Sequence, residues 1–207
     1  MTDVNTLAGL RICVVGDDLV SGLGDPKALG WTGRVAARTP HPAGGLAVFP
    51  LGIPGEGTPG LLERWRAETT RRYTSSTDNR LVVGLGSTDL DRGTTLARSR
   101  LNLANILDDA AADSIRTFVV GPPPTQDAAR NERVGELTAA FADVCDRRDV
   151  PFVDCYGPLS GHEEWFADLA AAAGPPELAR PGQAGYGLMA WLVLHGGWHA
   201  WLGLEQD

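Results

Sequence analysis

The chain has 207 residues and a net charge of −8 at pH 7, with 43% hydrophobic and 21% charged residues. This length and composition predict a single domain, spanning 1–207, with a hydrophobic core of its own. The acidic balance excludes a protein that binds phosphate backbones, because such a protein needs a basic face. We therefore expect no nucleic-acid partner.

Short apolar runs alternate with helical patterns along the chain. Five runs bounded by glycine or proline are typical of strands buried on both faces: Arg11–Gly16, Leu46–Leu51, Arg80–Leu85, Thr117–Gly121 and Pro151–Asp154. Apolar residues three or four apart predict helices over Thr58–Thr70, Thr95–Ala111, Ala128–Arg147 and from about Pro181 to Trp201. The alternation predicts a three-layer α/β/α domain with a five-stranded parallel sheet, whose functional loops follow the strands' carboxyl ends.

Cysteine usage and hydropathy predict a cytoplasmic protein. Cys13, Cys145 and Cys155 are odd in number and irregular in spacing, which is not a disulfide framework and suits a reducing compartment. The first ten residues lack the basic and apolar regions of a signal peptide. The most apolar segment, 187–203, is too short and too interrupted to span a bilayer.

Five motifs stand at the ends of the expected strands or at the start of the last helix. They are GDDL (16–19), LGIPGEGT (51–58), VGLGSTD (83–89), VGPPP (120–124) and ELARPGQAGYGLMAW (177–191). In this order the set resembles the SGNH hydrolases, also called GDSL esterases and lipases, over about residues 10 to 200. The resemblance implies a flavodoxin-like sheet and an esterase or lipase site in these loops.

The same resemblance shows where the chain departs from the family. By position, Asp18 replaces the nucleophilic serine, Thr88 replaces the asparagine, and Arg180 replaces the histidine base. Glu177 stands where the aspartate that orients the histidine would be. Gly55 keeps the glycine whose amide helps to form the oxyanion hole.

These substitutions argue against ordinary serine ester hydrolysis. That mechanism needs a hydroxyl nucleophile, a neutral imidazole and donors for the oxyanion. Arg180 does not give up a proton near neutral pH, and Asp18 cannot form an alkoxide. The expected reaction is an Asp18-centred one on a small organic substrate: acid–base catalysis, or attack on an epoxide-type carbon. Arg180 would then bind a substrate carboxylate or phosphate.

The alternative is a catalytically silent homologue that binds a ligand or a protein partner. Asp18 would lie at a helix N-terminus, where amides and the helix dipole stabilise a carboxylate. It would pair with Arg180 and place one oxygen in the oxyanion hole beside the Gly55 amide. An open pocket with a second titrating group favours the enzyme, whereas a closed ion pair favours the silent homologue.

Four further sets of residues complete the candidate list. His162, in GHEEW, is the one histidine considered as a substitute base, and Ser21 is interpreted as a helix-face residue. Asp17 and Asp89 are expected to hold nearby turns. His195 and His199 are interpreted as part of a packing stripe with Leu188, Trp191, Leu192 and Leu202. An ordinary solvated helix face is expected for Arg130, Glu132, Arg133 and Glu136. The sequence shows no motif for a cofactor or a metal.

Overall fold

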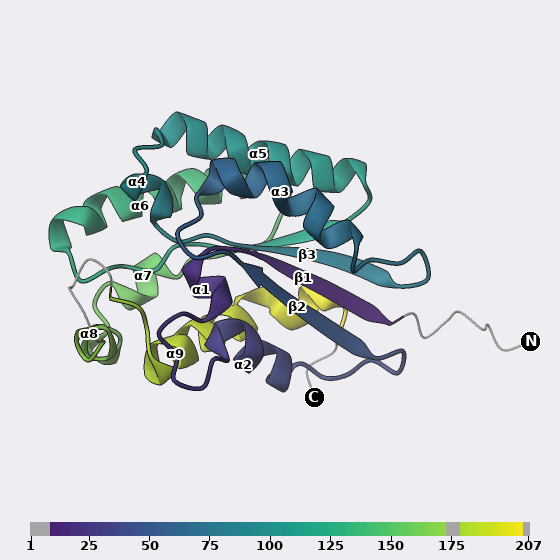
Figure 1. Cartoon of the computed structure of the whole chain (residues 1–207), viewed down its shortest axis with the longest axis horizontal. Coiled ribbons are helices and arrows are strands. Elements are labelled where there is room, and N and C mark those ends of the chain that lie inside the picture. Colours follow the sequence, from purple (N-terminus) through teal and green to yellow (C-terminus); the bar gives the residue numbers. More distant parts are fainter. Residues whose placement is uncertain (1–8, 173–178, 205–207) are drawn as a thin grey trace, which may run out of the picture.

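The computed structural model describes residues 9–172 and 179–204. Its sheet has five strands in the order β2-β1-β3-β4-β5, and every neighbouring pair is parallel (Figure 1). The strands are β1 (Leu10–Gly16), β2 (Leu46–Gly52), β3 (Asp78–Gly84), β4 (Arg116–Val120) and β5 (Phe152–Val153). This is the flavodoxin-like order. The predicted single α/β domain with a five-stranded parallel sheet is confirmed.

Burial differs between the centre and the edge of the sheet. The central strands β1, β3 and β4 are buried along most of their length, as predicted. The prediction is wrong for β2, whose residues are only half-buried or exposed. Since β1 is the only strand paired with β2 among the described residues, one edge of β2 is open. Pro50 is exposed in β2, as suits a residue without an N–H to donate.

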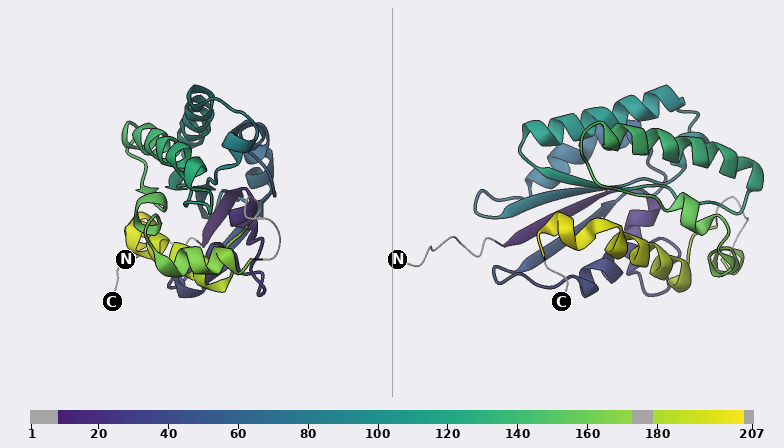
Figure 2. Two further views of the ribbon diagram at one scale, coloured as in Figure 1. Left: turned by 90° about the vertical axis from the view of Figure 1, so that its left-hand side faces the viewer. Right: turned by 180° about the vertical axis from the view of Figure 1, so that it is seen from behind.

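Helices cover both faces of the sheet (Figures 1 and 2). One layer holds α3 (Thr58–Thr70), α5 (Leu96–Ala112) and α6 (Ala128–Asp146). The other holds α2 (Gly30–Arg38), α8 (Glu163–Ala170) and α9 (Gln183–Val193). Short helices are α1 (Asp18–Ser21), α4 (Thr88–Asp91), α7 (Tyr156–Leu159) and α10 (His199–Leu202). A separate cluster of buried apolar residues lies on each side of the sheet, as a three-layer domain requires.

Two helices of the second layer were not predicted. In α2, Trp31 and Val35 are buried and four residues apart. In α8, Trp165 and Leu169 repeat the same spacing within only eight residues. Two buried side chains in a short segment give a weak periodic signal. Packing against α9 supplies the missing stabilisation.

The last predicted helix, Pro181 to Trp201, is broken in the structure. Its regular part ends at Val193, and a wider turn, Leu194–Trp198, joins it to α10. Gly197 lies in this turn at φ 97°, a conformation that side-chain-bearing residues rarely adopt. The glycine pair therefore interrupts the helix between His195 and His199.

The packing stripe predicted on this helix is wrong at Trp191 and His195, which are both exposed. Trp191 is 56% exposed, and its ring stacks on that of His195 with the centroids 4.1 Å apart. Leu202 is buried, and Leu188 and Leu192 pack partly buried against the core. Of the helices that the structure describes, none combines the length and hydropathy needed to cross a membrane.

Candidate functional site

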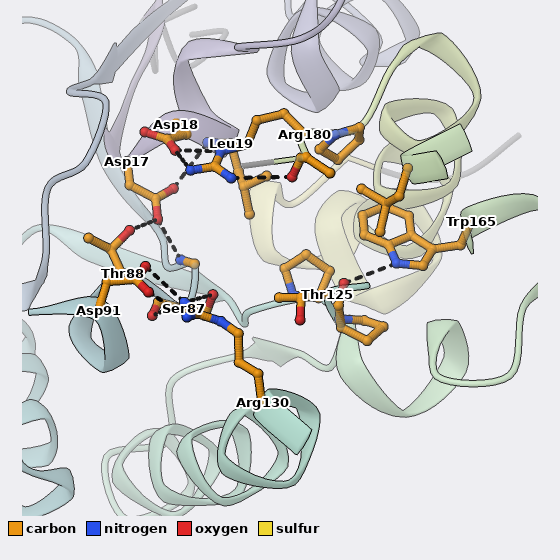
Figure 3. A pocket seen from close by; sticks show the side chains of 16 residues that line it. Asp17, Asp18, Leu19, Ser87, Thr88, Asp91, Thr125, Arg130, Trp165 and Arg180 are labelled. Carbon is orange, nitrogen blue, oxygen red and sulfur yellow. Dashed lines mark hydrogen bonds and ion pairs between the residues drawn. The ribbon is translucent and has the colours of Figure 1, made fainter. Parts of the chain in front are cut away.

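The sequence-predicted site lies at the carboxyl edge of the sheet, as Figure 3 shows in part. Asp17 and Asp18 follow β1 directly, and Asp18 is the first residue of α1. Gly55 lies in the loop after β2, and Thr88 begins α4 after β3. Arg180 precedes α9 and approaches from the second helix layer. Four separate chain segments therefore meet at the place where parallel sheets put their ligand sites.

A glycine makes the sharp turn from β1 into α1 possible. Gly16 has φ 154°, and a Cβ atom there would lie 2.0 Å from the carbonyl oxygen of Gly84 on β3. The chain then turns at Asp17, whose Oδ1 accepts a hydrogen bond from the Leu19 N–H at 3.1 Å. This turn directs the side chains of Asp17 and Asp18 to the carboxyl edge of the sheet.

Both carboxylate oxygens of Asp18 are engaged. Oδ1 accepts a hydrogen bond of 2.5 Å from the backbone N–H of Gly55, which adopts φ 73°. Oδ2 accepts one of 2.5 Å from Nε of Arg180 and forms an ion pair with Nη2 of the same guanidinium. The Asp18 side chain is 5% exposed and that of Arg180 27%. The carboxylate is thus buried, paired with Arg180 and held by the backbone amide of Gly55.

The position of Arg180 is fixed from α8. Oδ2 of Asp168 accepts hydrogen bonds from the backbone N–H groups of Gly182, at 2.6 Å, and Gly185, at 3.0 Å. These amides belong to the first turn of α9, where free donors need partners. Asp168 therefore caps α9 from a neighbouring helix and anchors the segment that carries Arg180. Sequence reasoning missed this residue, because a cap supplied from another element leaves no local pattern.

Asp17 is held by neutral donors. Besides the Leu19 N–H, its carboxylate accepts hydrogen bonds from the Gly86 N–H at 3.1 Å and the Thr88 hydroxyl at 3.2 Å. Burial raises the pKa of Asp17 to about 7; the charge of Asp18 adds to the rise, and the donors and the charge of Arg180 oppose it. The expectation that Asp17 bonds nearby backbone amides is confirmed.

Asp89 ties the start of α3 to α4. Its carboxylate accepts hydrogen bonds from the backbone N–H and the hydroxyl of Thr58, both at 2.7 Å. The Asn102 amide donates in turn to the Thr58 hydroxyl at 3.0 Å. The expectation that Asp89 holds a turn is confirmed, and this buried network gives the Thr88 corner a rigid support.

A pocket lies beside the Asp18–Arg180 pair. Its charged side includes Asp17, Asp18 and Arg180, and its polar side includes Thr88 and Thr125. Its apolar residues come from α1, the loop after β4, α8 and the segment before α9: Leu19, Pro123, Pro124, Trp165, Leu169, Ala179 and Pro181. A pocket with an apolar wall and a few polar groups is typical of a small-molecule site.

Arg130 also lines this pocket, which corrects the prediction of an ordinary solvated helix face for its surroundings. Its guanidinium forms a two-pronged ion pair with Asp91 of α4 (Figure 3). Nη2 also donates to the carbonyl and hydroxyl oxygens of Ser87, at 3.1 and 3.0 Å. The side chain is 22% exposed. Spacing on α6 gives no sign that this arginine reaches back to the sheet edge.

The structure brings together part of the predicted residue set. Asp18, Gly55 and Arg180 contact one another, whereas Thr88 bonds to Asp17. His162 precedes α8 and does not line the pocket; its Nδ1 is buried without a hydrogen bond among the described residues.

The remaining predicted residues need separate statements. Glu177 lies outside the residues that the structure describes. Ser21 is exposed, and its hydroxyl donates to the Asp18 carbonyl oxygen at 2.8 Å, which confirms a helix-face residue. No group of three or more potential metal ligands exists within 9–172 and 179–204.

The sheet has the flavodoxin-like strand order. Its site is built by the loops after β1, β2 and β3 and by the segment before the last helices. Together these features define a protein of the SGNH hydrolase fold. A model of the GDSL-like lipase/acylhydrolase family matches residues 14–188. The chain belongs to this family. No curated protein matches the chain.

Solved structures of similar fold include the three proteins described next. A lipase/acylhydrolase from Enterococcus faecalis has a TM-score of 0.73 and 22% identity, covering 95% of this chain and 98% of its own. An acetylxylan esterase from Geobacillus stearothermophilus has a TM-score of 0.75 and 17% identity, covering 97% and 98%. A lipolytic protein of the G-D-S-L family from Veillonella parvula has a TM-score of 0.71 and 18% identity, covering 90% and 97%. At these identities the likeness shows the fold alone.

Proposed function

We propose that this chain is a family member that binds a small organic ligand without hydrolysing it. The observation that carries the proposal is the state of Asp18: one oxygen lies on the Gly55 amide and the other on Arg180. In this position the carboxylate imitates the oxyanion that the glycine amide would stabilise during ester cleavage. The places of nucleophile and base are then filled by an ion pair.

Neither Ser21 nor His162 takes over the roles of the missing serine and histidine. The Ser21 hydroxyl is exposed and turned to the backbone of α1, so it does not enter the pocket. Arg180 stays protonated and therefore cannot activate a hydroxyl. His162 is absent from the residues that line the pocket. An acyl-enzyme pathway through positions 18 and 180 therefore lacks both its nucleophile and its base.

The pocket itself supports a binding function. It adjoins the ion pair, and both Asp18 and Arg180 contribute to its wall. Leu19 and Trp165 give it apolar surface, and the Trp165 indole N–H donates to the carbonyl oxygen of Pro124 at 3.0 Å. This bond fixes the ring in the wall, which lowers the entropy cost of binding a ligand there.

A second candidate is the Asp18-centred reaction, because Asp18 lines the pocket directly. A carboxylate oxygen would attack an epoxide carbon, form a carbon–oxygen bond and open the ring to an alkoxide, which takes a proton. Water would then hydrolyse the hydroxyalkyl ester with the help of a base. The Gly55 amide and Arg180 disfavour this attack, since both draw charge from the same carboxylate.

Styrene oxide distinguishes the two candidates. Purified natural chain and Asp18→Ala are incubated with it, followed by intact-mass measurement, peptide mapping and assay of the diol product. We expect no adduct at residue 18 and equal diol formation by both proteins. An adduct of one styrene oxide on Asp18, or diol formation that disappears in Asp18→Ala, would replace the binding proposal with the catalytic one.

A further inference from the structure

The pocket beside Asp18 has an apolar half. Leu19 of α1, Trp165 and Leu169 of α8, and Pro123 in the loop after β4 supply it. Burial of an apolar group here provides affinity without regard to its charge. The choice between ligands of equal shape then rests on the charged half.

Neither arginine of the pocket offers a free guanidinium to an anion. Arg180 donates through Nε to Asp18 and through Nη1 to the Ala179 carbonyl oxygen at 3.2 Å. Arg130 uses both terminal nitrogens on Asp91 and adds bonds to Ser87. Each positive charge is matched by one carboxylate. An incoming carboxylate or phosphate would therefore meet two arginines whose charges are already matched.

Among the described residues, Asp17 is the pocket carboxylate without an ion-pair partner. Five ionisable side chains line the pocket: Asp17, Asp18, Asp91, Arg130 and Arg180. Two ion pairs account for four of them, and among the described residues Asp17 forms no salt bridge. Its three donors are neutral, and the residue is 4% exposed. A buried carboxylate without a cation is costly, so a positively charged ligand group would relieve it.

We infer that the pocket selects a small organic cation, such as a primary ammonium group carried on a ring or short hydrocarbon, and rejects the matching carboxylate. Asp17 would accept a hydrogen bond from the ammonium group while the apolar half holds the hydrocarbon. This inference rests on the proposed binding function and deepens it by naming the ligand class.

Three probes of equal shape and different charge test the selection. Benzylamine, benzyl alcohol and benzoate are titrated into the natural chain at pH 8. The indole N–H signal of Trp165 is followed by NMR and assigned by its loss in Trp165→Phe. From the single unmatched charge we expect benzylamine to bind about threefold more tightly than benzyl alcohol and at least about tenfold more tightly than benzoate.

A matched pair of variants tests whether the pocket charges set this order. Asp91→Asn removes the carboxylate that neutralises Arg130, so benzoate should gain affinity by about tenfold while benzylamine loses. Asp143→Asn removes an equally charged ion-pair partner away from the pocket, where Asp143 bonds to Arg100 and Arg147. This control should leave the order unchanged.

The outcomes separate the two proposals. Benzoate binding as tightly as benzylamine, or an equal response to both variants, would overturn the charge selection and leave ligand binding intact. If none of the three probes moves the Trp165 signal, the pocket is not a ligand site, and the proposed function falls together with the inference.

Discussion

Asp17 and Asp18 are neighbours in sequence and equally buried, at 4% exposed, yet the protein holds them in opposite ways. Asp18 receives a cation and an amide, whereas Asp17 receives only neutral donors. The fold therefore accommodates a buried carboxylate at residue 18 because the Arg180 guanidinium pairs with it. Asp17, one residue earlier in the chain, carries a buried carboxyl group without an ion-pair partner among the described residues. Its pKa is therefore near neutral pH, and its protonation changes there.

The largest effect is expected from breaking the Asp18–Arg180 pair. Arg180→Met leaves Asp18 buried without its cation and should cost about 3 kcal/mol of unfolding free energy. Asp18→Ala should cost less, about 1–2 kcal/mol, since the 27% exposed arginine can turn to water. In the double variant the losses should fall short of their sum by about 2 kcal/mol.

Urea unfolding at pH 7 measures this cycle. Arg147→Met is the control, because its ion pair with Asp143 is exposed and should contribute less than about 0.5 kcal/mol. Strictly additive losses in the Asp18–Arg180 cycle would show that the two side chains do not stabilise each other.

An effect that is smaller per pH unit, and that has a distinctive pH dependence, is expected at Asp17. Its pKa is raised from 3.8 to about 7, so the folded chain binds this proton more tightly than the unfolded chain. As the pH rises from about 4 to about 7, the natural chain should lose stability relative to Asp17→Asn, by at most about 1.4 kcal/mol per pH unit. Above pH 7 the difference should level off.

Unfolding of both proteins at pH 5, 6, 7 and 8 gives this difference directly. Asp25→Asn is the matched control: although burial opposes it, hydrogen bonds from Arg34 and backbone amides lower the pKa of Asp25 to about 2. Stability contributed by Asp25 is lost only as the pH falls through that range, so its variant should show a constant difference from pH 5 to 8. A flat Asp17→Asn difference would contradict the contrast between the two carboxylates.

The smallest effect is expected at Thr88. Thr88→Val removes the hydroxyl that donates to Asp17 at 3.2 Å and should cost about 1 kcal/mol. Because this donor favours the ionised carboxylate, its loss should raise the pKa of Asp17 further. A carboxyl carbon NMR titration reads that pKa, and Thr88→Ser should keep it in place. An unchanged midpoint in Thr88→Val would remove Thr88 from the Asp17 network.

The sheet and the central site were predictable because local sequence patterns indicate both. Apolar runs bounded by glycine predicted β1, β3 and β4. Motifs at the strand ends and before the last helix predicted that Asp18, Gly55 and Arg180 lie at one edge of the sheet. The pairing of Asp18 with Arg180 followed from the positions that the family resemblance gave them and from their opposite charges.

Contacts between distant elements were not predictable. Asp168 caps α9 from α8, and Arg130 reaches from α6 to Asp91, although each looks like an ordinary surface residue in its own helix. The break at Gly197 and the exposure of Trp191 depend likewise on how the chain end packs. Periodicity records which residues share a face, but not which neighbour that face meets.

Ester hydrolysis tests most directly whether the Asp18–Arg180 pair has closed the family's hydrolytic site. Natural chain, Asp18→Ala and the double change Asp18→Ser with Arg180→His are assayed side by side on p-nitrophenyl acetate. We predict equal background rates for the first two. The double variant, which regains a hydroxyl and an imidazole beside the Gly55 amide, should exceed them by at least about tenfold. Rapid hydrolysis by the natural chain that Asp18→Ala abolishes would contradict a closed site and make Asp18 a catalytic residue.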